Sequence, residues 1–121
     1  MSALMYVSSA PWIMKSGRGP NRPTAVFAAS DTIAIGLLQA AFQEKISVPD
    51  QLSIVGFDDI DIARFTIPPL TTISQFGVEM GRIATEMVLD MIDKGTPHPD
   101  IPDVIVEPKL VVRQSTGPLP A

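Results

Sequence analysis

Short polar side chains stand at three places where this sequence could do chemistry. An acidic group runs from Asp58 to Asp61, Ser30 and Asp31 stand together earlier, and Gln75 with Phe76 comes later. Neighbouring carboxylates can serve as general acid and base or hold a cation. Carboxylate, hydroxyl and amide groups that gather in one place can instead bind the hydroxyl groups of a small molecule.

Catalysis and metal binding are both disfavoured by the details of these groups. Asp58 and Asp59 are adjacent and are expected to point in different directions, and Asp61 does not continue a calcium-loop pattern. Ser30 has no evident base, because the single histidine, His98, lies in a proline-rich link. The absence of cysteine excludes thiol catalysis, disulfides and Cys-ligated metals. We therefore predict a protein that is not an enzyme and needs no metal or cofactor.

The three polar groups each follow a predicted strand. Apolar runs and helical spacing predict strands at 25–29, 52–57 and 70–74, helices at 31–44 and 77–93, and one or two final strands within 104–112. This order predicts an α/β fold with a mostly parallel sheet flanked by helices. In such sheets ligands bind outside the carboxyl ends of the strands. The fold would therefore bring the three polar groups to one edge.

Each group also has a purely structural interpretation. Ser30 and Asp31 are good helix caps, the acidic group could be a solvated turn, and Gln75 with Phe76 could pack within a loop. Their convergence on one sheet edge is what favours a binding site.

The first predicted helix carries more apolar surface than one sheet face requires. It has two neighbouring apolar stripes, and only one can pack on the sheet. The first comprises Ala34, Leu37 and Ala41, and the second comprises Ile35, Leu38 and Phe42. A second element or a second subunit could cover the second stripe.

The second predicted helix carries a methionine-rich stripe. Its members follow helical spacing and predict core packing rather than a cofactor site. They are Met80, Ile83, Ala84, Met87 and Met91.

Composition limits the class of protein further. The chain has 121 residues, 45% of them hydrophobic, and a net charge of −4. This fits one globular domain and disfavours electrostatic binding of nucleic acid. No stretch is long enough to span a membrane, and the N-terminus makes a poor signal peptide, so we expect a cytoplasmic protein. We expect an irregular segment at 1–22 that Trp12 could anchor, a domain at 23–117 and a tail at 118–121.

Several linked motifs resemble the C-terminal part of the effector-binding domain of LacI/GalR-type transcription regulators. They occur in order and at close spacing over residues 22–118. The motifs are Pro23 to Leu37, Val48 to Asp50, Ser53 to Asp59, Pro68 to Ile73 and Leu110 to Thr116.

The resemblance implies one lobe of a periplasmic-binding-protein-like type I fold. Members of the family join a helix-turn-helix domain to a two-lobed sensor, in which a small molecule, often a sugar, shifts operator affinity. The helix-turn-helix and almost all of the N-terminal lobe have no counterpart in this sequence, so a truncated regulator that does not itself bind DNA is expected.

Site residues carry over by position. Asp58 matches an aspartate that contacts effector, Ser30 stands where the family often has Asn, and Gln75 and Phe76 fall in a loop that borders the site.

Family dimers pack partly through the helix that matches residues 31–44 and the segment that matches residues 64–67. The implied homodimer interface comprises Ile35, Leu38, Phe42, Phe65 and Thr66.

The leading hypothesis is thus a sugar-sensing, dimerising lobe of a LacI-type regulator. Two alternatives remain open: a fragment of a periplasmic-type sugar-binding protein that serves transport, and a remnant with only a dimerising role.

Overall fold

The computed structural model describes residues 23–95 and 103–119. The elements follow the order β1 (Ala25–Phe27), α2 (Asp31–Gln43), β2 (Ser53–Val55), η2 (Asp61–Phe65), β3 (Thr72–Ser74), α3 (Gly77–Lys94) and β4 (Lys109–Val111). The predicted α/β class is confirmed. The short 3₁₀ helix η2 was not predicted from the sequence. The predicted segment with Trp12 and the link with His98 lie outside the described residues.

The strands form two connected pairs. β1 and β2 are parallel, with Val26 opposite Ile54, and a parallel bridge joins Val55 to Thr71 just before β3. β3 and β4 are antiparallel, with Ile73 opposite Leu110. The parallel arrangement therefore holds for the first strands, and the last pair departs from it.

The last strand is shorter than the sequence suggests. β4 covers only Lys109–Val111, and residues 104–106 lie outside any strand, so a second final strand at 104–106 is wrong. Pro108, which directly precedes β4, has no N–H to give to a ladder, and this helps set the start of pairing.

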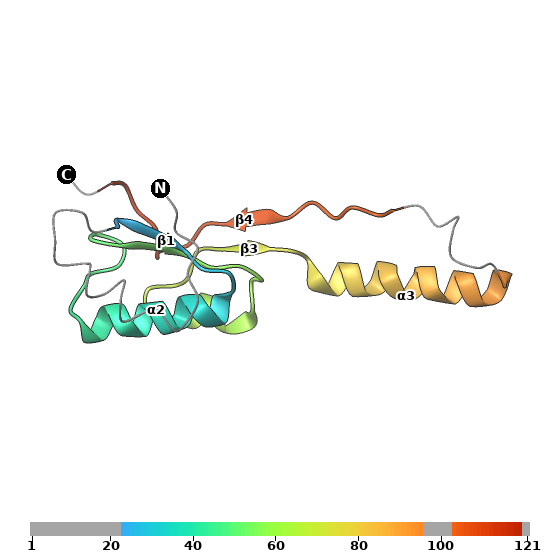
Figure 1. Ribbon diagram of the computed structural model, residues 1–121, viewed down its shortest axis with the longest axis horizontal. Coiled ribbons are helices and arrows are strands. Elements are labelled where there is room, and N and C mark those ends of the chain that lie inside the picture. The colour runs from blue at the N-terminus through green and yellow to red at the C-terminus, as the bar shows by residue number, and fades with distance from the viewer. Residues whose placement is uncertain (1–22, 96–102, 120–121) are drawn as a thin grey trace.

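A single core lies between the strands and α2. Its ten members come mainly from β1, α2, β2 and the segment that leads to β3. They are Val26, Ala28, Ala34, Leu37, Leu38, Ala41, Leu52, Ile54, Ala63 and Leu70. Figure 1 shows α2 along one side of the strands. We call this part, residues 23–74 with 112–117, the body.

The ends of α2 follow from its sequence. Ser30 is the N-cap, as predicted, and its hydroxyl accepts a hydrogen bond from the Ile33 amide at 3.3 Å. At the other end Lys45 takes a left-handed conformation with φ of 57°, and the Ile46 amide donates to the Ala41 carbonyl at 2.8 Å. This bond ends the last turn of the helix, and the chain then continues toward β2.

Ser115 joins the C-terminal segment of the described chain to the body through hydrogen bonds. Its hydroxyl accepts from the Thr71 amide at 2.8 Å and donates to the Ile54 carbonyl at 2.6 Å. Its carbonyl accepts from the Ile54 amide at 2.8 Å. Ser115 is fully buried, so these bonds satisfy backbone groups that water cannot reach.

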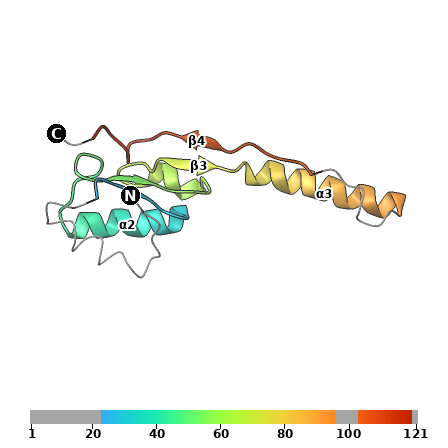
Figure 2. The same ribbon diagram turned by 45° about the horizontal axis from the view of Figure 1, so that its top comes forward.

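α3 stands apart from the body. Both views show it extending away from α2 on the far side of β3 (Figures 1 and 2). None of its residues is buried, which overturns the prediction that its methionine stripe packs in a core. Ile83, Met87 and Met91 are half-buried, whereas Met80 and Ala84 are exposed. The periodicity identified an apolar face correctly, but the described chain supplies no layer to cover it.

Two local features mark the end of α3. Asp90 accepts a hydrogen bond from Lys94 at 2.7 Å, and Gly95 ends the helix in a left-handed conformation with φ of 61°. Within residues 23–95 and 103–119, no helix has the length and apolar character needed to cross a membrane.

Candidate functional site

The strand ends meet as the α/β pattern predicts. The Asp31 amide donates to the Phe57 carbonyl at 2.7 Å, which joins the start of α2 to the end of β2. The Asp58 amide donates to the Ile73 carbonyl at 2.9 Å, which joins the same loop to β3. The carboxyl ends of three strands therefore lie at one edge, where ligands bind in open α/β sheets.

Asp58, Gln75 and Phe76 form the accessible part of this edge. The Gln75 side-chain amide donates to Asp58 Oδ1 at 2.7 Å, so the structure brings these two predicted residues into direct contact. Phe76 follows at the start of α3, where it is 43% exposed. An exposed carboxylate and an amide are thus in contact, and an exposed aromatic residue follows them in the chain. These groups can offer hydrogen bonds and an apolar surface to a small polar ligand.

Ser30 has a different position. Its hydroxyl caps α2, and it is only half-buried. The backbone bond between Asp31 and Phe57 brings Ser30 to the same edge as Asp58, but the structure gives no direct contact between their side chains. The structural interpretation of Ser30 as a helix cap is therefore confirmed.

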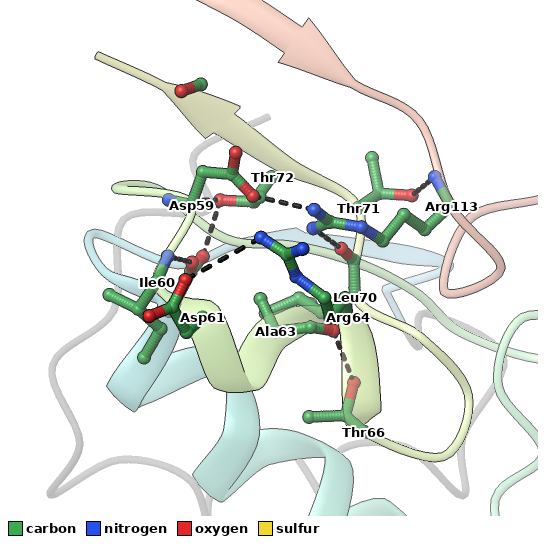
Figure 3. A network of polar contacts seen from close by, with 12 residues as sticks. Asp59, Ile60, Asp61, Ala63, Arg64, Thr66, Leu70, Thr71, Thr72 and Arg113 are labelled. Carbon is green, nitrogen blue, oxygen red and sulfur yellow. Dashed lines mark hydrogen bonds and ion pairs between the residues drawn. The ribbon is translucent and has the colours of Figure 1, made fainter. Parts of the chain in front are cut away.

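Asp59 turns away from Asp58, as the sequence predicts for adjacent carboxylates. Its Oδ1 pairs with Arg113 Nη2 at 2.7 Å, and both side chains are at most one-fifth exposed. Arg113 also donates to the Leu70 carbonyl at 2.8 Å (Figure 3). Asp59 is therefore part of a structural contact between the loop after β2 and the segment after β4, and it does not pair with Asp58 as acid and base.

Sequence reasoning missed the role of Asp31 and Thr72. Asp31 was interpreted as a possible cap, but its carboxylate is fully buried and accepts bonds from the Thr72 hydroxyl at 2.5 Å and the Ile60 amide at 2.9 Å. Gly56 leaves room for this carboxylate, because a Cβ there would lie 2.1 Å from Asp31 Oδ1. No local pattern in the sequence marks the contact between Asp31 and Thr72, which lie 41 positions apart.

A second surface lies on α2. A shallow hollow of about 230 Å³ is lined by Ile35, Leu38, Gln39, Thr66 and Ile67. Most of the predicted interface residues therefore share one surface. Phe42 and Phe65 stand close by in the chain, 83% and 72% exposed.

Leu38 differs from the expectation of a stripe that needs outside cover. It is buried within this chain, so its exposed edge contributes only to the floor of the hollow. Ile35 is half-buried, and Phe42 is the member of the stripe that remains open.

Among the described residues, no group of three or more His, Asp or Glu side chains is arranged to hold a metal ion.

A family model for the periplasmic binding protein-like domain matches residues 3–116. The chain belongs to this family. The match includes residues 3–22, which lie outside the described residues and which we expected to be an irregular segment before the domain.

Curated relatives identify the branch of the family. The ribose operon repressor of Haemophilus influenzae is 45% identical over 95 residues, which are 78% of this chain and 28% of the relative. The transcriptional repressor CytR of Escherichia coli is 43% identical over 101 residues, which are 84% of this chain and 29% of the relative. The chain therefore spans less than a third of the length of these relatives. They are repressors and not enzymes, which agrees with the prediction of a non-enzymatic role.

Solved structures give the same assignment. A LacI family regulator from Enterococcus faecium with bound ribose matches with a TM-score of 0.81 and 29% identity, over 93% of this chain and 40% of that one. A LacI family regulator from Lactobacillus casei with bound sucrose matches with a TM-score of 0.74 and 30% identity, over 89% of this chain and 39% of that one. The chain is thus homologous to part of the effector-binding domain of LacI-type regulators, as the motifs indicated.

Proposed function

We propose that this chain is a sugar-sensing part of a LacI-type transcriptional regulator that acts in the cytoplasm. The observation that carries the proposal is the exposed Asp58 carboxylate, which accepts a hydrogen bond from Gln75 at the carboxyl edge of the strands. The ribose and sucrose in related structures support a carbohydrate as the effector.

The chemistry of the site suits a sugar. The Asp58 carboxylate can accept hydrogen bonds from sugar hydroxyls, and each charge-assisted bond contributes roughly 1.5–3 kcal/mol. The Gln75 amide offers a second N–H and a carbonyl oxygen besides the bond to Asp58. Phe76, the residue after Gln75, has an exposed side chain.

DNA binding is not part of the proposed role of this chain. Its net charge is −4, and affinity for duplex DNA depends on clustered Lys and Arg that displace counterions from phosphates.

Calorimetric titration with ribose, glucose and sucrose tests the sensing role. We expect heat of binding with at least one of these sugars, and Asp58→Ala should weaken that affinity by about tenfold or more, because it removes a charge-assisted bond. Asp90→Ala is a matched control, since Asp90 is also an exposed carboxylate but lies more than three helical turns into α3. Absence of binding by the wild type, or equal affinity for Asp58→Ala, would contradict the proposal.

We also propose that two copies pack through the hollow on α2. Its mostly apolar lining and the exposed side chains of Phe42 and Phe65 form a patch that a two-fold axis can pair with itself. Large exposed apolar patches usually mark such interfaces.

Sedimentation at tens of micromolar tests the dimer. Phe42→Asp should give a monomer, and Ile92→Asp on α3, 69% exposed, should leave the dimer intact. Phe42 is preferred to Leu38 for this test, because Leu38 is buried and its replacement would also disturb the core. A monomeric wild type would contradict the dimer, and a dimer lost only in Ile92→Asp would place the interface on α3. A dimer without any sugar binding would favour the purely dimerising alternative.

A further inference from the structure

The loop after β2 holds an unfavourable backbone conformation at the proposed effector site. Asp58 has φ of 110° and Asp59 has φ of 53°, both in the left-handed range that favours glycine. Neither residue is a glycine, so the conformation persists only where surrounding contacts enforce it. Such strain is typical of sites where a side chain must be aimed.

Three consecutive backbone N–H groups of this loop are held from outside it. The Asp58 amide donates to the Ile73 carbonyl at 2.9 Å. The Asp59 amide donates to Thr72 Oγ1 at 3.4 Å, and the Ile60 amide donates to Asp31 Oδ2 at 2.9 Å. The second and third acceptors are side-chain oxygens, so these two bonds depend on which residues stand at positions 72 and 31.

The two side-chain acceptors are linked to each other beneath the loop. The Thr72 hydroxyl donates to Asp31 Oδ1 at 2.5 Å, and both side chains are fully buried. Gly56 leaves room for the carboxylate, because a Cβ at that position would lie 2.1 Å from Asp31 Oδ1. Burying a carboxylate costs free energy unless the group is well hydrogen-bonded, so a functional reason for this arrangement is expected.

We propose that Asp31 and Thr72 are positioning residues that hold the loop so that the Asp58 carboxylate faces the effector. The inference rests on the proposed function, in which Asp58 contacts the sugar. Asp31 fixes Ile60 on one side of the loop, and Thr72 fixes Asp59 directly after Asp58. The ion pair between Asp59 and Arg113 holds the same loop from the segment after β4.

The hydroxyl of Thr72 is the part of this arrangement that a substitution can isolate. It donates to Asp31 and accepts from Asp59 at the same time, which only a serine or threonine hydroxyl can do at this position. Thr72→Val keeps the shape of the side chain and removes both bonds. Thr72→Ser keeps both bonds, so it is the conservative rescue.

Hydrogen exchange measured by NMR on the ligand-free full chain tests the arrangement without any sugar. In the wild type the Ile60 amide should exchange slowly although it lies in a loop. In Thr72→Val the Asp59 and Ile60 amides should exchange about tenfold faster or more, whereas the Ile54 amide in the core should not change. The Gln75 side-chain amide resonances should shift toward those of Asp58→Asn, which marks loss of the carboxylate contact. Thr72→Ser should resemble the wild type in each measurement.

Ribose titration of the same variants gives the functional readout. Thr72→Val should lose about as much affinity as Asp58→Asn, and Thr72→Ser should stay within about threefold of the wild type. If the wild type binds no sugar, the proposed function fails while the exchange data still decide the positioning role. A rapidly exchanging Ile60 amide in the wild type overturns the inference even if Thr72→Val does not fold. Unchanged exchange and Gln75 resonances in a folded Thr72→Val overturn it as well.

Discussion

Each of the two long helices has an apolar face, and the two faces lie in opposite environments. α2 buries Ala34, Leu37, Leu38 and Ala41 against the strands, whereas α3, although longer, buries none of its residues. Periodicity therefore predicts that a helix forms and which face is apolar. Whether that face is covered depends on other parts of the fold, which a local pattern does not encode.

The helices also differ in what stabilises them. α2 depends on burial, while α3 carries ion pairs along its own surface, with Arg82 bonded to Glu79 and Glu86 and Lys94 bonded to Asp90. Exposed pairs at this spacing contribute only a few tenths of a kcal/mol each. The body should therefore respond strongly to loss of apolar volume, and α3 should respond weakly.

The largest expected effect comes from truncating one apolar side chain in each helix. Leu37→Ala in α2 should lower the free energy of unfolding by about 2–5 kcal/mol, because it leaves a cavity in the core. Met87→Ala in α3 should cost less than about 1 kcal/mol, since its side chain is only half-buried. Urea denaturation of both variants measures the difference. Equal losses would mean that the apolar face of α3 is covered in solution.

Two glycines give a smaller effect of opposite sign. Gly56→Ala should destabilise the body by about 1–3 kcal/mol, because the new Cβ would collide with the Asp31 carboxylate and Leu70. Gly81→Ala should increase the helicity of α3 and stabilise it by up to about 1 kcal/mol, since nothing lies within 4 Å of the added Cβ. Thermal unfolding followed by circular dichroism separates them. A stabilising Gly56→Ala would show that Asp31 does not occupy the position described.

The smallest expected effect is the pH response of α3. Hydrogen bonds from Arg82 lower the pKa of Glu79 below its ordinary value of 4.5. Because the folded pKa is the lower one, this contribution is fully present above pH 4.5 and is lost as the pH falls through the folded pKa. Helical circular dichroism should therefore decrease slightly below that pH in the wild type. In Arg82→Gln this part of the decrease should vanish, and an identical titration would rule out the contact.

Local signals predicted much of the fold and of the accessible site. Ser30 is typical of a helix N-cap and stands at the start of α2, and Gly95 is typical of a helix C-cap and stands at the end of α3. The adjacency of Asp58 and Asp59 predicts that their side chains point in different directions. Such features depend on neighbours within a few residues, so a sequence pattern contains them.

The parts that sequence reasoning missed depend on distant partners. Asp31 and Thr72 are 41 residues apart, and Asp59 and Arg113 are 54 apart, so neither contact leaves a local pattern. Each is fixed by strand order and register, which are known only once the whole sheet is assembled. The uncovered face of α3 has the same cause, because cover is a property of the assembled fold.

The burial of Ser115 also has a consequence for the order in which the protein matures during synthesis. The Ile54 amide donates to Ser115 and the Ile54 carbonyl accepts from Ser115, which lies 61 positions later in the chain. During translation the residues of β1, α2 and β2 leave the ribosome before that residue, so the Ile54 amide and carbonyl bond to water until Ser115 is in place. Contacts of such long sequence separation slow folding and prolong the exposure of strand edges. The body should thus reach its full stability only after Ser115 has paired with Ile54 and Thr71.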